Sequence, residues 1–322
     1  MRLMLALSAL VLLLFVGSLT VGPAGFGGLS ALWGGDGPMP LIMHEIRLPR
    51  ALLGLMIGLS LGLSGAAMQG YLRNPLAEPG LIGVSSTAAL GAVLAIHTGL
   101  AGAWMLGLPL AALAGAVIGV GLILLLAGPR GGSLTLILAG IALSAMAAAL
   151  TSLVLNLAPN PWAANEIIFW MMGSLADRSM THVWLALPLM VVGWLLLATT
   201  GRGLDALTLG EDTAAAMGID MRRLRLVLVF GTACVIGAGV AVAGSIGFVG
   251  LVVPHLLRPL VQARPSHLLW ASALGGAAMV LAADIAVRIM LPDGDLKLGV
   301  LTALVGAPLF LHLIYKTRRG LA

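Results

Sequence analysis

Residues 103–127 of the chain read AWMLGLPLAALAGAVIGVGLILLLA, a continuous apolar run without a charged side chain. A helix needs about 20 such residues to cross the hydrocarbon core of a bilayer. The run lacks the polar and apolar alternation of a membrane β-strand, and a helix satisfies its backbone hydrogen bonds internally. The stretch therefore predicts a membrane-spanning α-helix.

The rest of the chain repeats this pattern. Hydrophobic residues make up 60% of the 322 residues and charged residues only 9%, too few to cover a water-facing surface. We expect an all-α polytopic membrane protein with about ten spans, in which residues 1–322 form a single domain. Residues 3–21 could instead be a secretory signal, but their length and the later spans favour a first helix. The expected spans are residues 3–21, 51–71, 81–100, 103–127, 134–157, 183–200, 224–244, 247–261, 267–290 and 298–315.

The basic residues predict the orientation. An even number of spans places both termini on one side, and cytoplasmic loops carry the excess of lysine and arginine. Most of the 17 basic residues fall on the side of the termini, so we expect both termini in the cytoplasm and an external loop at about residues 23–46. The exceptions, expected outside, are Arg47, Arg50, Arg178, Arg288 and Lys297.

Arg47 and Arg50 stand at the start of the second span, on the side that should be poor in positive charge. Pro49 suits a first helical turn, and we expect the two guanidinium groups to project together from the external face. They could reach lipid phosphates, or they could recruit an acidic external protein. Arg288 is a third candidate, although Asp284 one turn earlier could pair with it.

The longest polar stretch on the cytoplasmic side covers about residues 201–223. A short helix can start at Thr208 or Gly210 and end at Gly218, with acidic residues in its positively polarised first turn. The stretch is either an ordinary interfacial loop or a docking element for a cytoplasmic partner. Its expected apolar anchors are Leu207, Leu209, Met217 and Ile219.

Several kinds of chemistry are excluded. ATP hydrolysis would need a loop ending in Gly-Lys-Ser/Thr, but the only lysines, Lys297 and Lys316, follow Leu296 and Tyr315. No His-Glu-x-x-His motif occurs, and the single Cys234 cannot form a disulfide or thiolate cluster within one chain. We expect no catalytic residue, metal ligand or cofactor here, and the net charge of +5 to record orientation rather than nucleic-acid binding.

A secondary transporter working alone and an intramembrane enzyme are the alternatives from other classes. The first gains little support, because no pair of carboxylates lies within one expected span. The second would need a cluster of polar residues at one depth, which the sequence does not show.

Several blocks of sequence together resemble one family. They are residues 46–50 (IRLPR), 62–69 (GLSGAAMQ), 74–84 (NPLAEPGLIGV), 247–255 (GFVGLVVPH) with Arg258, 282–284 (AAD) with Arg288, 299–303 (GVLTA) and 306–308 (GAP). In this order they resemble the FecCD/BtuC-type permeases of ABC importers for iron-siderophores, haem and vitamin B12. The likeness covers almost the whole chain.

The resemblance implies a type II importer permease of ten helices in the bacterial inner membrane. It implies a second permease subunit, which we expect to form a homodimer, and two cytoplasmic ATPases that bind ATP and Mg. A periplasmic or lipid-anchored binding protein would deliver the cargo. We expect this cargo to be a metal chelate, iron(III)-siderophore first, with haem or cobalamin as further possibilities.

The resemblance also implies roles for particular residues. Arg47, Arg50 and Arg288 would meet glutamates on the binding protein. The substrate path would run between two permeases beside the fifth and tenth spans, where we expect Ala139, Gly140, Ser144 and Ala147 to line it. The ATPase would receive the coupling segment, whose residues are Leu207, Leu209, Gly210, Glu211, Asp212, Ala215, Met217 and Gly218.

Overall fold

The computed structural model describes residues 2–22, 29–34, 37–128, 132–291 and 296–319. All regular elements in these ranges are helical, which confirms the predicted fold class. The longer helices are α1 (Arg2–Thr20), α3 (Leu48–Tyr71), α4 (Val84–His97), α6 (Gly107–Ala127), α7 (Ser133–Asn156), α8 (Pro161–Met171), α9 (Met180–Ala198), α12 (Met221–Ala243), α13 (Val249–Leu257), α14 (Pro265–Met290) and α15 (Leu298–Arg319). The short elements are η1 (Leu29–Trp33), α2 (Met39–Ile42), η2 (Met43–Arg47), η3 (Pro79–Ile82), α5 (Leu100–Ala103), α10 (Gly201–Leu207), α11 (Glu211–Ala216) and η4 (Arg258–Val261).

The expected spans all correspond to helices. Seven helical segments are long and apolar enough to cross a membrane, and three shorter apolar helices accompany them. Each of the ten predicted runs falls on one of these segments, while the number of crossings and the orientation of the termini stay predictions. The expected external loop is itself partly helical, with η1, α2 and η2, and its residues 23–28 and 35–36 lie outside the described residues.

One of the longer helices was not expected. Helix α8 follows α7 and starts at Pro161, with the side chain of Asn160 accepting a hydrogen bond from the Ala163 N–H at 2.9 Å. An asparagine cap followed by proline in the first turn is a typical helix start. At 11 residues α8 is too short for a span, so a search for long apolar runs misses it.

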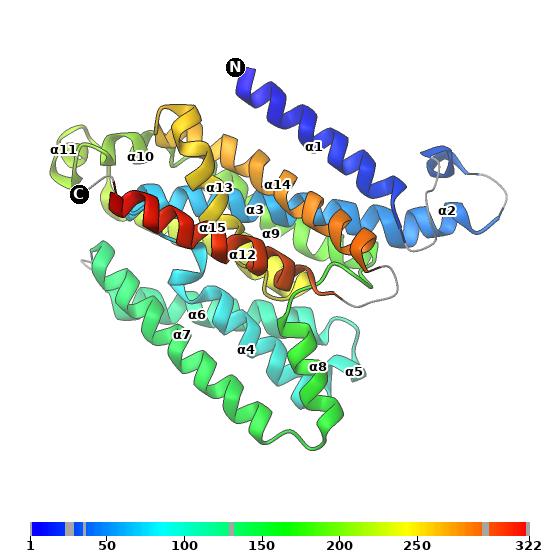
Figure 1. The fold of residues 1–322 in the computed structure, drawn as a ribbon. Helices are drawn as coiled ribbons and strands as arrows, with labels where there is room; N and C mark the ends of the chain where they lie inside the picture. The colour runs from blue at the N-terminus through cyan, green and yellow to red at the C-terminus, as the bar shows by residue number, and fades with distance from the viewer. Residues whose placement is uncertain (1, 23–28, 35–36, 129–131, 292–295, 320–322) are drawn as a thin grey trace.

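Figure 1 shows how the helices are arranged. Helices α3 and α14 run beside each other, with α1 on the outer side of α14. Helices α4, α6, α7 and α8 form a second group, in which α7 lies at the edge of the molecule opposite α1. The short helices α10 and α11 lie at one end of the bundle, and α2 and α5 lie at the other.

Glycines allow α3 to approach α14 closely. A Cβ atom on Gly62 would overlap the carbonyl oxygen of Ser272, and one on Gly58 would overlap the backbone of Ala277. In lipid, where apolar side chains gain little by leaving the solvent, such close packing is a main source of helix association. Gly54, Gly58 and Gly62, each four residues apart, therefore form the face of α3 that contacts α14.

We expect Gly62→Val to lower the stability of the protein by about 2 kcal/mol, because the added methyl groups must push two backbones apart. The measurement is the apparent Tm of the purified protein in detergent. Gly121→Val is the matched control, because a Cβ on this α6 glycine meets nothing within 4 Å. An equal loss of Tm in both variants would contradict the contact.

Two non-helical segments meet inside the bundle, one between α12 and α13 and the other just before η3. Between α12 and α13 the chain leaves the helical conformation at residues 244–247, and Phe248 adopts a left-handed φ of 67°. The side chain of Glu78, just before η3, accepts a hydrogen bond from the Phe248 N–H at 3.1 Å. Gln69 joins them, since it donates to the Leu251 carbonyl at 3.1 Å and accepts from Arg258 at 2.7 Å. These contacts satisfy polar groups that an interrupted helix leaves open.

Candidate docking and coupling sites

A buried carboxylate organises the end of α14 that lies near α2. Asp284 is 1% exposed and lies between two arginines. Arg50, in the first turns of α3, pairs with it through Nη2 at 2.9 Å and donates from Nε to the same oxygen at 2.9 Å. Arg288, one turn further along α14, pairs with the other oxygen at 2.8 Å. The predicted pairing of Arg288 with Asp284 is confirmed, and Arg50 is an additional partner.

The end of α1 supplies the remaining acceptors of this cluster. Arg288 donates to the carbonyl oxygens of Ser18 and Val21 at 2.8 and 2.6 Å, and also to the Ser18 hydroxyl at 2.6 Å. Arg47 donates to the carbonyl oxygens of Leu19 and Thr20 at 3.1 and 2.9 Å. The last carbonyls of a helix lack partners within it and carry partial negative charge, so cations are favoured there. The arginines thus fasten α1 to α3 and α14.

This geometry corrects one expectation. Arg47 and Arg50 do not project together from the external face, because Arg47 is 2% exposed and Arg50 is turned to Asp284. Arg288 is likewise buried, at 6% exposed. The Arg50 side chain retains 14% exposure. The sequence contains no local signal that the end of α1, 27 or more residues away along the chain, accepts from Arg47. Among the described residues, the cluster combines three guanidinium groups with the Asp284 carboxylate.

The polar stretch at residues 201–223 folds much as predicted. Helix α11 starts after Gly210, whose φ is 106°, and is followed by Gly218, whose φ is 84°. Glycine adopts such positive φ angles more readily than other residues. Glu211 and Asp212 occupy its first turn. Of the two predicted starts, Thr208 and Gly210, the structure has Gly210, and the predicted end at Gly218 is confirmed.

The apolar residues of this segment divide into two sets, which corrects the expectation that all of them are anchors. Leu207 and Ala214 are completely buried and hold α10 and α11 against the bundle. Leu209 and Met217 are 63% and 61% exposed. The remaining members of the expected coupling segment lie at its surface: Glu211, Asp212, Ala215 and Gly218 are exposed, and Gly210 is half-buried. The segment therefore presents two large apolar side chains outward.

Asp205 links this segment to α14. Its carboxylate accepts from the Ser266 N–H at 2.8 Å, the Ser266 hydroxyl at 2.7 Å and Arg264 Nε at 3.0 Å. It thus acts as an N-cap for α14, supplied by α10. Partial burial would raise the pKa of Asp205, but the hydrogen bonds from Ser266 and Arg264 outweigh it and lower the pKa below its ordinary value.

We expect Asp205→Asn to lower stability by about 1 kcal/mol at neutral pH. Because the folded state lowers the pKa, the carboxylate stabilises the protein above its unfolded pKa of about 4, and this contribution is lost as the pH falls further. The measurement is the apparent Tm of both proteins from pH 7 downward. The difference between them should shrink in acid, and a constant difference would contradict the ionic role of Asp205.

The residues expected to line a path between two permeases lie mostly inside one protomer. Ala139 and Ala147 are 7% and 2% exposed, and Gly140 packs where a Cβ would overlap the Leu81 carbonyl oxygen. Ser144 is half-buried. Elements η3 and α4 cover this face of α7 in the single protomer, so the role of Ala139, Gly140 and Ala147 in a path stays a prediction. The exposed face of α7 instead carries small residues at Ala142, Ala145, Ala149 and Ser152, at a three–four spacing that the sequence itself displays.

The whole chain is similar to one family of membrane transporters. The model of the FecCD transport family matches residues 4–316. The chain belongs to the FecCD transport family. This confirms the resemblance recognised from the sequence motifs, and it establishes a multi-pass membrane protein of a transport family.

The individual proteins that resemble this FecCD-family chain are also described as transporter proteins. An uncharacterised ABC transporter permease protein, YvrB, of Bacillus subtilis is 37% identical over 92% of this chain and 84% of its own length. The vitamin B12 import system permease protein BtuC of Citrobacter koseri is 39% identical over 87% of this chain and 84% of its own length. A solved structure described as an inward-facing, metal-chelate type ABC transporter superposes with a TM-score of 0.88 at 34% identity, covering 98% of this chain and 99% of that one.

Proposed function

We propose that this chain is the membrane-spanning permease subunit of an ABC importer that takes up a metal chelate. The observation that carries the proposal is the agreement over nearly the full length with a metal-chelate type ABC transporter, at a TM-score of 0.88. In this proposal two copies form the path, two cytoplasmic ATPases bind ATP and Mg, and an external binding protein delivers the cargo. The chain itself makes and breaks no covalent bond.

The identity of the chelate is the finer part of the proposal. Iron(III)-siderophore is the expectation from the sequence, with haem as a further possibility. The names of relatives favour cobalamin, since a permease of a vitamin B12 import system is 39% identical over 87% of this chain. We therefore propose a metal chelate as the cargo. The uptake of cobalamin and the uptake of iron(III)-siderophore are the two measurements to compare.

Coupling would run through α10 and α11. Leu209 and Met217 offer an apolar contact to an ATPase, and movement of α10 would reach α14 through the Asp205–Ser266 hydrogen bonds. Helix α14 carries the Asp284 cluster 18 residues beyond Ser266, at the other end of the bundle. Alternating access would then be a shift between two packings of the bundle, biased by ATP binding.

The path between two copies would use the exposed face of α7. Small side chains at Ala142, Ala145, Ala149 and Ser152 leave room for a bulky cargo and offer few strong contacts, which suits a chelate whose metal is already coordinated. Helix α15, expected beside the path, exposes Leu304 and Leu311.

Reconstitution tests the proposal. Vesicles containing the chain with its cognate ATPase and binding protein should accumulate radiolabelled cobalamin or iron(III)-siderophore only when ATP is enclosed on the ATPase side. Omitting the ATPase should abolish uptake. Uphill uptake by the chain alone would instead establish the secondary transporter.

Docking of the binding protein gives a further prediction. Arg50 is the most exposed of the three arginines in the Asp284 cluster, so we expect Arg50→Glu to reduce uptake at least tenfold, by opposing an acidic partner and by placing a second carboxylate beside Asp284. The measurement is uptake, together with the affinity of the binding protein for the reconstituted permease. Arg50→Gln, which keeps a donor without the charge, should give an intermediate loss. Unchanged uptake in Arg50→Glu would contradict the docking role.

A further inference from the structure

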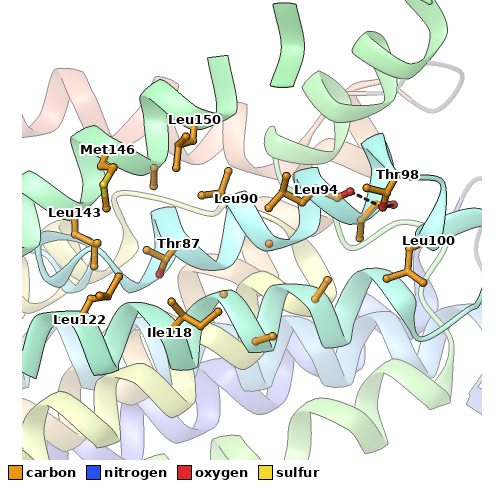
Figure 2. Close-up of a pocket in the computed structure, with 16 residues that line it drawn as sticks. Thr87, Leu90, Leu94, Thr98, Leu100, Ile118, Leu122, Leu143, Met146 and Leu150 are labelled. Atoms are coloured by element: carbon orange, nitrogen blue, oxygen red, sulfur yellow. Dashed lines mark hydrogen bonds between the residues drawn. The ribbon is translucent and has the colours of Figure 1, made fainter. Parts of the chain in front are cut away.

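A cavity of about 430 Å³ opens between α4, α6 and α7. Figure 2 shows its walls: Leu143, Met146 and Leu150 point from α7 toward α4, while Ile118 and Leu122 approach from α6. Leu100 of α5 stands near one end. The cavity borders the edge of the molecule at α7 and is distinct from the Asp284 cluster and from the coupling segment.

The groove exists because α4 and α6 touch while α7 stands further off. A Cβ on Gly91 would overlap the Ala111 carbonyl oxygen, and one on Gly115 would overlap the Thr87 carbonyl oxygen. These two helices therefore form a tight floor. The side chains of Leu94, Ile118 and Met146 along the groove are 44%, 61% and 50% exposed, so the groove is open toward the surroundings of the bundle.

The lining has no charged side chain and no free hydrogen-bond donor to offer a ligand. Its only polar side chains are Thr87 and Thr98. Thr87 donates to the Gly83 and Val84 carbonyl oxygens at 3.2 and 3.1 Å, and Thr98 donates to the Leu94 carbonyl at 2.8 Å. Both hydroxyl protons are thus engaged within α4. A polar or charged molecule, including a metal chelate, would lose its hydration here without compensation, so the occupant must be hydrocarbon.

The dimensions identify the kind of hydrocarbon. From Thr87 to Thr98, the C-cap residue of α4, the groove follows the helix for about 17 Å at 1.5 Å per residue. Spread over that length, 430 Å³ corresponds to a cross-section of about 26 Å². A helix of a second copy, about 10 Å across, is too thick for this slot. One extended methylene chain, with neighbours at about 4 Å, fits it.

We propose that the α4–α6–α7 groove binds one acyl chain of a membrane phospholipid as a structural ligand. The chain is a multi-pass membrane protein, so phospholipid surrounds these helices, and an acyl chain lying in the groove supplies α4, α6 and α7 with the dispersion contacts that an empty slot would lose. The lipid joins the outlying α7 to the α4–α6 floor. This inference depends on the membrane location alone and not on the cargo or the ATPase.

Native mass spectrometry of the protein purified from bacterial membranes in a mild detergent tests the proposal. The wild-type protein should retain one phospholipid per protomer, and Ala114→Phe, which fills the groove from α6, should reduce that occupancy at least fivefold. Ala148→Phe is the matched control, since Ala148 is exposed on α7 but does not line the groove; it should retain the lipid. Leu94→Trp fills the groove from an exposed position on α4 and serves as the second variant if Ala114→Phe fails to fold.

Adding back palmitoyl-oleoyl phosphatidylethanolamine gives an independent readout. It should raise the apparent Tm of delipidated wild-type protein and of Ala148→Phe, but not of the two groove-filling variants. The proposal is overturned if the wild-type protein retains no lipid, or if the filled variants retain as much as the wild type. It is also overturned if Ile118→Cys, made in a Cys234→Ser background, cross-links two protomers through a short reagent, because a second copy would then occupy the groove.

Discussion

Replacing Asp284 by alanine is expected to destabilise the protein by about 3–5 kcal/mol, enough to remove most folded protein from a detergent extract. The carboxylate is 1% exposed and holds Arg50 and Arg288 at 2.9 and 2.8 Å. Without it two guanidinium groups remain in a space with little water, and removing one partner of a buried ion pair costs far more than the pair contributes. The measurement is the folded fraction after size-exclusion chromatography together with the apparent Tm.

Two further variants test the reason for this loss. Glu166→Ala removes an exposed carboxylate from α8 and should leave the Tm unchanged. Combining Asp284→Ala with Arg288→Met should recover part of the lost stability, because one of the unpaired charges is then removed. A Tm for Asp284→Ala within one degree of the wild type would show that the cluster does not hold α1, α3 and α14 together.

Replacing Leu209 and Met217 together by glutamate is expected to abolish association with the ATPase and to lower uptake at least a hundredfold. These side chains are 63% and 61% exposed, so charges there should leave the fold intact while opposing an apolar contact. The measurements are co-purification of the ATPase and ATP-driven uptake in vesicles. Deleting residues 211–217 should likewise uncouple ATP hydrolysis from uptake.

Leu41→Glu is the matched control for this pair. Leu41 is 67% exposed on α2, at the opposite end of the bundle, so this variant should co-purify the ATPase as the wild type does. If the double variant keeps both the ATPase and full uptake, then α10 and α11 do not form the coupling contact.

The sequence predicted some parts of the fold and site well. The ten apolar runs each coincide with a helix or an apolar helical segment, because hydrophobic length is a local property. The start of α11 was predicted at Thr208 or Gly210 and its end at Gly218, because cap residues and glycines mark helix ends locally. The pairing of Asp284 with Arg288 was predicted because both residues lie one turn apart on the same helix.

Other parts depended on contacts between distant segments. Arg47 was expected to project from the external face, yet it is buried, because the folded chain brings the carbonyl oxygens at the end of α1 close enough to accept from it. Ala139, Gly140 and Ala147 were expected to line a path, and the folded chain packs them inside the single protomer. Helix α8 was missed because its start is marked by Asn160 and Pro161 rather than by a long apolar run.

Local properties of the sequence, namely apolar length and glycine position, were enough to predict a bundle of membrane helices with a polar segment containing a short helix at one end. The tertiary structure alone decided which side of each helix is covered, where the arginines find acceptors and where the α4–α6–α7 groove opens. The physical reason is that a helix in lipid is apolar on every side, so its composition does not distinguish the face that packs from the face that meets the bilayer.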